Sequence, residues 1–178
     1  MSIYKLQVAG LERGLKICEV NEHLDIAAFI MFSDVELTVA CAERLNALAP
    51  EHDLIITAES KGIPLAYEMS RQSGKKYILA RKSPKLYMRD PVQVDVKSIT
   101  TAKIQALYLD SEDLEHMRGK KILIVDDVIS TGDSVRAIEK LVEHADATVV
   151  GKMAVLAEGD AINRKDIIYL AELPVFPK

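Results

Sequence analysis

The segment from Ile122 to Val135, with the sequence ILIVDDVISTGDSV, combines three features that could do chemistry. An apolar run ends in the acidic pair Asp126 and Asp127, and small polar residues then lead into a helical pattern. Backbone N–H groups at a helix N-terminus favour an anion, and so does the helix dipole, so this turn could bind a monophosphate. The candidate phosphate ligands are Ser130, Thr131, Gly132, Asp133 and Ser134.

The acidic pair lies too close to this turn to bind the phosphate itself, but its carboxylates can accept hydrogen bonds from a sugar diol. Pair and turn together therefore predict a site for a ribose 5-phosphate group, which is more specific than a glycine motif alone. The alternative is an ordinary strand–turn–helix connection, with solvated aspartates and a hydroxyl or Asp133 capping the helix. The sequence has no GxxxxGK[ST] pattern, which excludes a Walker-type loop, and no GxGxxG to support a dinucleotide site.

This segment resembles the fingerprint of the type I phosphoribosyltransferases: a hydrophobic strand, two acidic residues and a small-residue loop. The resemblance implies an α/β fold with a central, mostly parallel sheet flanked by helices, an N-terminal hairpin and a flexible hood. It assigns Asp126 and Asp127 to the 2′ and 3′ hydroxyls of the sugar and residues 130–134 to the 5′-phosphate. Many adenine enzymes carry glycine where this chain has Asp133, so we expect its N–H to bind phosphate while its side chain faces away or caps the helix.

A second turn, Glu59-Ser60-Lys61-Gly62, is similar to the pyrophosphate loop of purine phosphoribosyltransferases. Backbone N–H groups and a cation aimed at a departing pyrophosphate would lower the barrier. Taken alone, the turn and the basic stretch from Arg81 to Arg89 also fit a surface loop and a solvated basic face. The resemblance implies that pyrophosphate is bound by Glu59, Ser60, Lys61, Gly62, Arg81, Lys82 and Lys85, and that the catalytic residues are Asp126, Asp127 and Lys61.

The residues of the purine pocket are the ones that the sequence indicates least clearly. Residues 15–21 (LKICEVN) resemble a segment of xanthine-type enzymes, which implies that Leu15 and Asn21 line the pocket together with Val128 and Ile129. The alternative places Leu15 and Asn21 in the N-terminal hairpin alone. Residues 94–110 match the hood in position, and VKSIT at 96–100 is similar to a xanthine-type pattern, whereas adenine enzymes carry S-Y-x-L-E-Y-G there. Adenine is the leading base, and xanthine and guanine stay open.

Alternating strands and helices must position these residues, and their order predicts a parallel sheet with its ligand site beyond the carboxyl ends of the strands. We predict that Ser33 caps the first helix, whose apolar stripe contains Val35, Val39, Ala42 and Leu45. The predicted strands are 4–9 and 15–20, which form a hairpin with a loop at 10–14, followed by 53–58, 76–80, 121–125 and 148–156. The predicted helices are 33–48, 64–71 and the one after the phosphate turn. We predict that residues 94–110 form a hairpin or flap and that residues 166–178 cover the core.

Composition narrows the class of protein. The 178 residues fit one domain, and the net charge of −4 argues against a protein that mainly binds nucleic acid. No apolar run is long enough to span a membrane. Cys18 and Cys41 lack metal-type spacing, the four histidines are scattered, and no signal segment is evident, so we expect two buried thiols and a cytoplasmic location.

The resemblance implies an enzyme that joins a purine base to phosphoribosyl pyrophosphate, uses Mg²⁺ and forms a homodimer. Mg²⁺ would mainly coordinate substrate oxygens and water, so we expect no direct protein ligand, with Asp126 or Asp127 acting through water. The alternative is a non-catalytic regulator that binds phosphoribosyl pyrophosphate. Such regulators need a DNA-reading region, and the N-terminal part of this sequence is too short for a winged helix and is not basic.

Overall fold

The computed structural model describes residues 2–97 and 104–178. Its centre is a parallel sheet in the order β10-β9-β8-β4-β5. The strands are β4 (Leu54–Ala58), β5 (Tyr77–Ala80), β8 (Lys121–Ile129), β9 (Thr148–Glu158) and β10 (Ile168–Leu173). Every residue of β4 is buried, as expected for a strand covered on both faces. The predicted α/β fold with a parallel sheet flanked by helices is confirmed.

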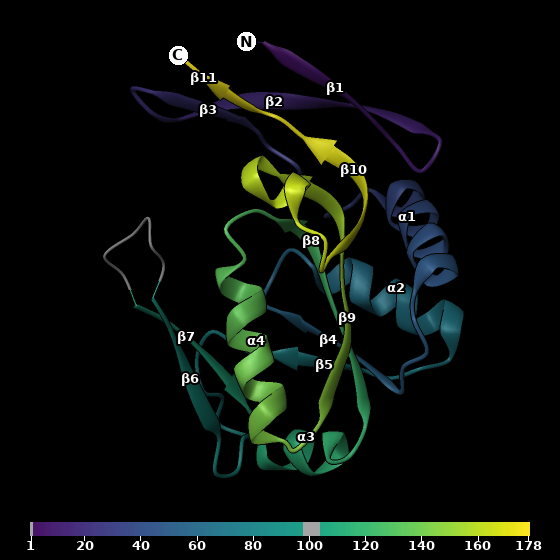
Figure 1. Cartoon of the computed structure of the whole chain (residues 1–178), viewed down its shortest axis with the longest axis vertical. Helices are drawn as coiled ribbons and strands as arrows, with labels where there is room; N and C mark the ends of the chain where they lie inside the picture. The colour runs from purple at the N-terminus through teal and green to yellow at the C-terminus, as the bar shows by residue number, and fades with distance from the viewer. Residues whose placement is uncertain (1, 98–103) are drawn as a thin grey trace.

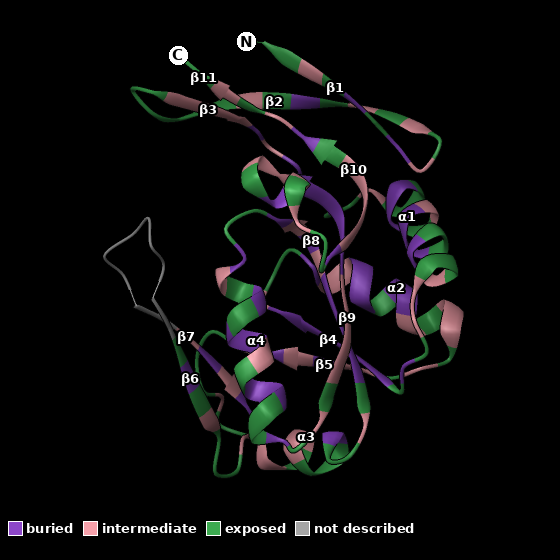
Figure 2. Cartoon of the chain, in the orientation of Figure 1, coloured by how far each residue is buried: buried purple, intermediate pink, exposed green. Residues whose placement is uncertain are grey.

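The helices cover both faces of this sheet (Figure 1). They are α1 (Val35–Leu48), α2 (Ile63–Ser73), α3 (Ser111–Met117) and α4 (Asp133–His144). On one face, Ile138 and Leu141 of α4 belong to the same apolar cluster as Ile124. On the other, helices α1 and α2 cluster with alternate strand residues such as Leu123 and Val125. The inner sides of the helices are accordingly buried and the outer sides exposed (Figure 2).

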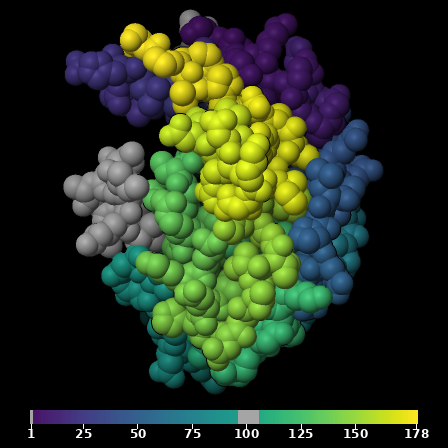
Figure 3. Space-filling model, viewed as in Figure 1, coloured from purple at the N-terminus to yellow at the C-terminus, as the bar shows by residue number. Residues whose placement is uncertain are grey.

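A second, antiparallel sheet joins the two ends of the chain in the order β1-β2-β3-β11. Its strands are β1 (Ile3–Val8), β2 (Leu11–Asn21), β3 (Leu24–Ala27) and β11 (Val175–Pro177). N- and C-terminal segments therefore lie side by side at one end of the molecule (Figure 3). The hairpin was predicted with a loop at 10–14, which is wrong: Ala9 and Gly10, both at positive φ, form the turn, and Leu11 already begins β2.

The predicted flap is a hairpin of β6 (Val92–Lys97) and β7 (Ile104–Leu109). The backbones of Arg81 and Tyr108 exchange hydrogen bonds of 2.9 and 2.8 Å, which tie the hairpin to the end of β5. Val94 and Leu107 are buried in the α4 cluster. Residues 98–103, which include most of the xanthine-like pattern, lie outside the described part of the chain.

Helix α1 differs from its prediction at its start and in its phase. It begins at Val35, and the carboxylate of Asp34, not the hydroxyl of Ser33, accepts from the N–H of Leu37 at 3.1 Å. The buried side includes Leu37, Cys41 and Leu45, whereas Val35 is 72% exposed, so the predicted stripe was partly wrong. The buried face of α1 is set by Leu37 and Cys41, which lie on the other side of the helix from Val35.

Only one of the two cysteines is buried, so the prediction for Cys18 was wrong. Cys18 is exposed on β2, whereas Cys41 lies inside α1, where burial raises the pKa of its thiol to about 12.

The described residues form no helix that is both long and apolar enough to cross a membrane. The C-terminal segment, which was predicted to cover the core, supplies strands β10 and β11. A short 3-10 helix, η1 (Gly159–Asn163), precedes β10.

Candidate active site

The two loops singled out in the sequence meet at one edge of the parallel sheet. Strands β4 and β8 are hydrogen-bonded neighbours that run in the same direction, so residues 59–62 and 130–134 both follow a carboxyl end. A cavity of about 340 Å³ lies between them. It is lined by Ala58, Glu59, Ser60, Lys61, Lys82, Leu107, Asp126, Asp127, Val128 and Ser134.

Asp126 and Asp127 both line this cavity, but they lie within a strand rather than after it. The predicted end at Val125 was too early, because β8 continues to Ile129 beside β9. The N–H of Asp127 donates to Oδ1 of Asp126 at 2.9 Å. Asp127 is only 3% exposed, and among the described residues its Oδ2 has no hydrogen-bond partner. An acceptor this buried is ready for a ligand that donates hydrogen bonds.

The electrostatics of the pair are set by burial and by mutual repulsion. Burial raises the pKa of the Asp126 carboxyl well above its ordinary value, and the charge of Asp127 raises it further. Lys61 opposes this shift, since its charge favours the ionised carboxylate. The lysine Nζ lies 3.6 Å from Oδ2 of Asp127, so the predicted catalytic residues Asp126, Asp127 and Lys61 are brought together.

Gly62 lets the second loop lie directly against the acidic pair. A Cβ at this position would sit 2.5 Å from Oγ1 of Thr57 and 2.9 Å from Oδ1 of Asp126. Its φ of −77° suits any residue, so the requirement for glycine is one of space. Glu59 and Ser60, joined by a cis peptide bond, precede it and line the cavity.

Glu59 and Arg81 hold the second loop to the end of β5. The Glu59 carboxylate accepts from the N–H of Lys82 at 2.7 Å and pairs with Nε of Arg81 at 2.7 Å. Burial alone would raise the pKa of Glu59, but the Lys82 N–H and the charges of Arg81 and Lys85 lower it below its ordinary value. Arg81 thus contacts protein groups, and Lys82 is the basic residue of this stretch that lines the cavity.

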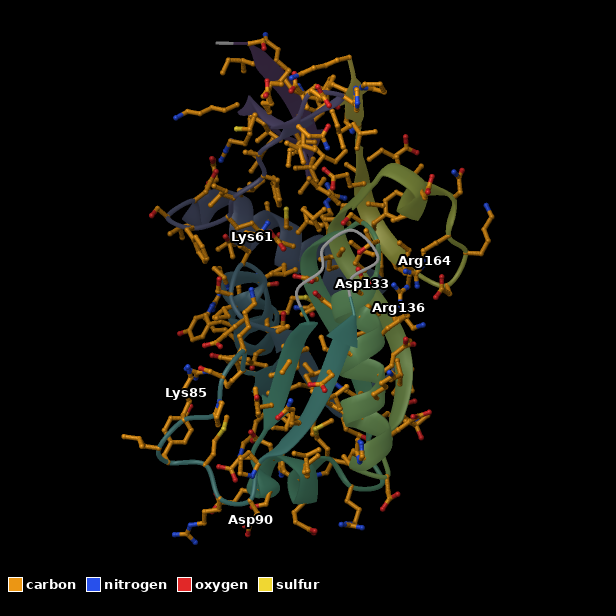
Figure 4. All side chains as sticks on the ribbon, turned by 90° about the vertical axis from the view of Figure 1, so that its left-hand side faces the viewer. Lys61, Lys85, Asp90, Asp133, Arg136 and Arg164 are labelled. Atoms are coloured by element: carbon orange, nitrogen blue, oxygen red, sulfur yellow. The ribbon has the colours of Figure 1, made fainter. Side chains whose placement is uncertain are left out.

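Lys85 lies farther along the same loop. Its ammonium donates to Oγ of Ser83 at 2.8 Å, and Lys85 is not among the residues that line the cavity. Figure 4 shows it well separated from Lys61. Its charge nevertheless lowers the pKa of Glu59, which lines the cavity, so its place at the pyrophosphate stays a prediction.

The phosphate turn encloses a smaller cavity of about 50 Å³, lined by Asp126 and residues 128–135. Gly132 is the N-cap of α4 with φ of +79°, a conformation in which glycine is favoured. The residues Ser130, Thr131 and Ser134 are exposed. All five predicted phosphate ligands line this cavity, at the N-terminal end of a helix whose dipole favours an anion.

Asp133 is bound within the turn. Its Oδ2 accepts from the hydroxyl of Thr131 at 2.8 Å, and its N–H approaches the same hydroxyl oxygen at 3.4 Å. Its Oδ1 pairs with the guanidinium of Arg136. The N-cap of α4 is Gly132, with no side-chain cap hydrogen bond, so of the two predicted alternatives the Asp133 side chain does not take the capping role. The Asp133 N–H is directed at the hydroxyl of Thr131.

The predicted base pocket is divided between two places. Val128 lines both cavities, and Ile129, 2% exposed, lines the small one. Leu15 is instead buried in the cluster beneath the N-terminal sheet. Asn21 is exposed at the end of β2, where its side chain accepts from the N–H of His23. Neither Leu15 nor Asn21 lines a cavity beside the acidic pair.

Two residues of this region were missed by sequence reasoning. Leu107 of the hood lines the large cavity and adds an apolar side chain to its wall. Glu158 ends β9 beside β8, where burial raises the pKa of its carboxyl and the charge of Lys61 lowers it in part. The position of Glu158 at a strand end was the available signal, but its nearness to Lys61 depends on strand order.

The comparisons with known proteins agree with this geometry. Residues 37–171 match the family model described as phosphoribosyl transferase domain, and the chain belongs to that family. It is 33% identical over 126 residues to an adenine phosphoribosyltransferase of Rhodococcus jostii, covering 71% of this chain and 69% of the relative. It is 35% identical over 108 residues to a hypoxanthine/guanine phosphoribosyltransferase of Methanococcus voltae, covering 61% of this chain and 54% of the relative.

Solved structures show the same fold. An adenine phosphoribosyltransferase of Saccharomyces cerevisiae, complexed with an imino-altritol bisphosphate and adenine, superposes with a TM-score of 0.69 at 19% identity. The match covers 88% of this chain and 92% of that one. The enzyme from Thermoanaerobacter pseudethanolicus gives a TM-score of 0.67 at 21% identity, covering 80% and 84%.

Proposed function

We propose that the protein is a purine phosphoribosyltransferase whose preferred base is adenine. It would convert adenine and phosphoribosyl pyrophosphate to AMP and pyrophosphate. The observation that carries this proposal is the position of Asp126 and Asp127, which line one cavity between the phosphate turn and the loop at 59–62. The family match and the adenine phosphoribosyltransferase relatives support it.

Each part of the cavity suits one part of the donor. The phosphate turn binds the 5′-phosphate, and the acidic pair accepts hydrogen bonds from the ribose hydroxyls. Lys61 and the N–H groups of its loop face the pyrophosphate. A purine ring nitrogen attacks C1′ while the bond from C1′ to the pyrophosphate oxygen breaks, and the bonding electrons leave with pyrophosphate. Positioning and electrostatics lower the barrier, with no covalent intermediate on the protein.

The carboxylates that line the cavity also fit Mg²⁺, because this ion prefers oxygen ligands and keeps several waters. When bound, it would neutralise charge on the pyrophosphate oxygens. Asp126 or Asp127 would hold it through water, and substrate oxygens would complete its shell. The buried Oδ2 of Asp127, which has no hydrogen-bond partner among the described residues, is well placed to accept from such a water.

Adenine is the proposed base because adenine phosphoribosyltransferases of R. jostii and Thermosipho africanus are 33% and 34% identical to this chain. The hypoxanthine/guanine enzymes of methanogens are similarly close over a shorter region, so guanine and hypoxanthine are the rival bases. Val128 and Leu107 offer apolar contacts to any purine ring. Leu15 and Asn21 lie in the N-terminal sheet, and they would contact the base only if this sheet moved toward the cavity or the bound base extended to the sheet.

One relative favours a second candidate function. The purine biosynthesis repressor PurR of Bacillus subtilis is 27% identical over 115 residues, covering 65% of this chain and 39% of the repressor. A regulator would use the same cavity to bind phosphoribosyl pyrophosphate without turnover.

One assay separates these functions. The protein is incubated with Mg²⁺, phosphoribosyl pyrophosphate and adenine, hypoxanthine, guanine or xanthine in turn, and nucleotide and pyrophosphate are measured. Turnover with adenine far above the other bases supports the proposal, and turnover with another base moves the specificity. Binding of the donor without turnover of any base would leave the regulator. The Asp126→Asn, Asp127→Asn double variant controls for contaminating activity.

We also propose that residues 1–178 form one domain and that two copies form a homodimer in the cytoplasm. The pairing of β11 with β3, which places both chain ends in one sheet, supports the single domain. An apolar groove of about 340 Å³ between α1 and α2, bordered by Val35, Val39 and Tyr67, supports the dimer. The free, exposed Cys18 suits a reducing compartment.

A further inference from the structure

The phosphate turn contains a negative charge at the place where an anion should bind. The side chain of Asp133 is only 12% exposed, and Asp133 lines the small cavity with the other four residues of the turn. A carboxylate beside a phosphate dianion is repulsive, and the repulsion grows where solvent is excluded. The chain must therefore compensate this charge if the turn is to hold a 5′-phosphate.

Arg136, one helical turn after Asp133, supplies the opposite charge. Its Nη2 pairs with Oδ1 of Asp133, and its Nη1 donates to the backbone carbonyl of Thr131 at 3.1 Å. Asp133 in turn accepts from the Thr131 hydroxyl. One guanidinium thus fixes both the backbone of the turn and its carboxylate.

A second guanidinium approaches the turn at Gly132, close to that of Arg136. Nη1 of Arg164 lies 2.5 Å from the position that a Cβ on Gly132 would occupy. Its Nε and Nη2 are held by Asp166 at 2.9 and 2.7 Å, and Lys152 binds the same carboxylate at 3.1 Å. Figure 4 shows Asp133, Arg136 and Arg164 gathered on one side of the molecule.

We propose that Arg136 is a positioning residue for the 5′-phosphate of the donor: it cancels the charge of Asp133 beside the phosphate. The inference rests on the proposed function, because it assigns the phosphate to residues 130–134. Arg136 need not touch the ligand. Its effect on binding passes through Asp133, and this dependence separates the proposal from a general role in stability.

A matched pair elsewhere in the chain provides the control. Arg118 also pairs with an acid three residues away, Glu115, at 2.8 Å, and with Asp146 at 3.0 Å; its side chain is 54% exposed compared with 49% for Arg136. Arg118 lies at the end of α3, away from both cavities. Glu115 is 70% exposed, whereas Asp133 is 12% exposed, so Arg118→Met removes a solvent-exposed ion pair and should leave ligand binding unchanged.

The experiment measures binding of ribose 5-phosphate by isothermal titration calorimetry and thermal unfolding by scanning calorimetry. For Arg136→Met, removal of the counter-charge should raise Kd about tenfold, with a larger effect at low salt. Asp133→Asn in the Arg136→Met background should restore Kd to within about threefold of wild type, because the carboxylate charge that Arg136 balances is gone. Arg136→Lys should retain most of the binding, and Arg118→Met all of it. With phosphoribosyl pyrophosphate as substrate, KM should rise more than kcat falls.

Two results would overturn the inference. One is a wild-type Kd in folded Arg136→Met, and the other is a loss of binding that Asp133→Asn leaves unrelieved. If the wild-type protein itself fails to bind ribose 5-phosphate, the proposed function falls, and the inference falls with it. If Arg136→Met unfolds at too low a temperature for the binding measurement, Arg136→Lys and Asp133→Asn alone are measured instead. Asp133→Asn alone should bind the ligand at least as tightly as wild type.

Discussion

The ammonium of Lys61, in the loop at 59–62, lies 3.6 Å from Oδ2 of Asp127 in β8. Lys61 is 54% exposed, whereas the Asp127 side chain is 4% exposed, so one partner faces the ligand space and the other is fixed. In the proposed reaction, Lys61 is the cation at the leaving group and Asp127 is a carboxylate at the sugar. Substitutions at either residue should therefore affect different parts of the reaction.

Lys61→Met should lower kcat by about a hundredfold, because a charge aimed at the departing pyrophosphate acts mainly in the transition state. KM for the base should change little. Steady-state kinetics with adenine and phosphoribosyl pyrophosphate measure both. Lys121→Met is the control, since Lys121 is 50% exposed and pairs with Glu51 at 3.2 Å far from the cavity. Equal effects of the two substitutions would refute the role of Lys61.

The raised pKa of Asp126 predicts how stability depends on pH. The native protein holds this proton at pH values where the unfolded chain has lost it, so Asp126 contributes stability that declines as pH rises. The decline begins near the ordinary pKa of 3.8 and ends above the raised value. Asp126→Asn should remove this component, which is measured as the difference in unfolding free energy between wild type and variant across pH. A difference that stays constant with pH would contradict the assignment.

Donor binding should show the opposite dependence on pH. The ribose hydroxyls donate hydrogen bonds, so the ionised form of Asp126 binds the sugar better than the acid. Affinity for ribose 5-phosphate should therefore rise as pH increases through the raised pKa of Asp126, and Asp126→Asn should flatten the profile. Titration calorimetry at several pH values checks this, and a wild-type profile that Asp126→Asn leaves unchanged would contradict it.

Gly62→Ala should reduce activity about tenfold or more through displacement of the loop, because small misplacements of reacting groups are costly. The added Cβ would meet Asp126 Oδ1 at 2.9 Å, and the backbone itself fits alanine. Gly14→Ala is the control, as its Cβ would meet only the end of the Ile3 side chain at 3.1 Å. Wild-type kinetics in Gly62→Ala would show that the loop does not need this close approach.

Val35→Glu should dissociate the proposed dimer, because Val35 is 72% exposed beside the apolar groove between α1 and α2. A charge there has no partner in an apolar interface. Sedimentation equilibrium of wild type and variant measures the change. The exposed Val20→Glu on β2, away from the groove, is the control. A wild-type protein that sediments as a monomer would contradict the dimer.

The chemistry at the sheet edge could be predicted because it is local in sequence. An apolar strand, two acids, a glycine-containing turn and a helix occur together in residues 122–135, and the fold confirms their order. The loop at 59–62 joins them because buried parallel strands such as β4 align their carboxyl ends.

Other features depend on contacts between distant residues. The approach of Arg164 to Gly132 and the nearness of Glu158 to Lys61 arise from strand order and side-chain direction. The phase of α1 was misjudged because valine at 35 matched a helical period, although Leu37 faces the core. Leu15 and Asn21 were assigned by a short resemblance, which carries no information about the distance of the N-terminal sheet from the cavity.

If ribose 5-phosphate binds with its phosphate at residues 130–134 and its hydroxyls at Asp126 and Asp127, a crystal structure with this ligand should show both contacts. Phosphate oxygens should lie within hydrogen-bonding distance of the turn, and the 2′ and 3′ hydroxyls should lie against the two carboxylates. A ligand found elsewhere, or bound with its phosphate away from the turn, would contradict this placement.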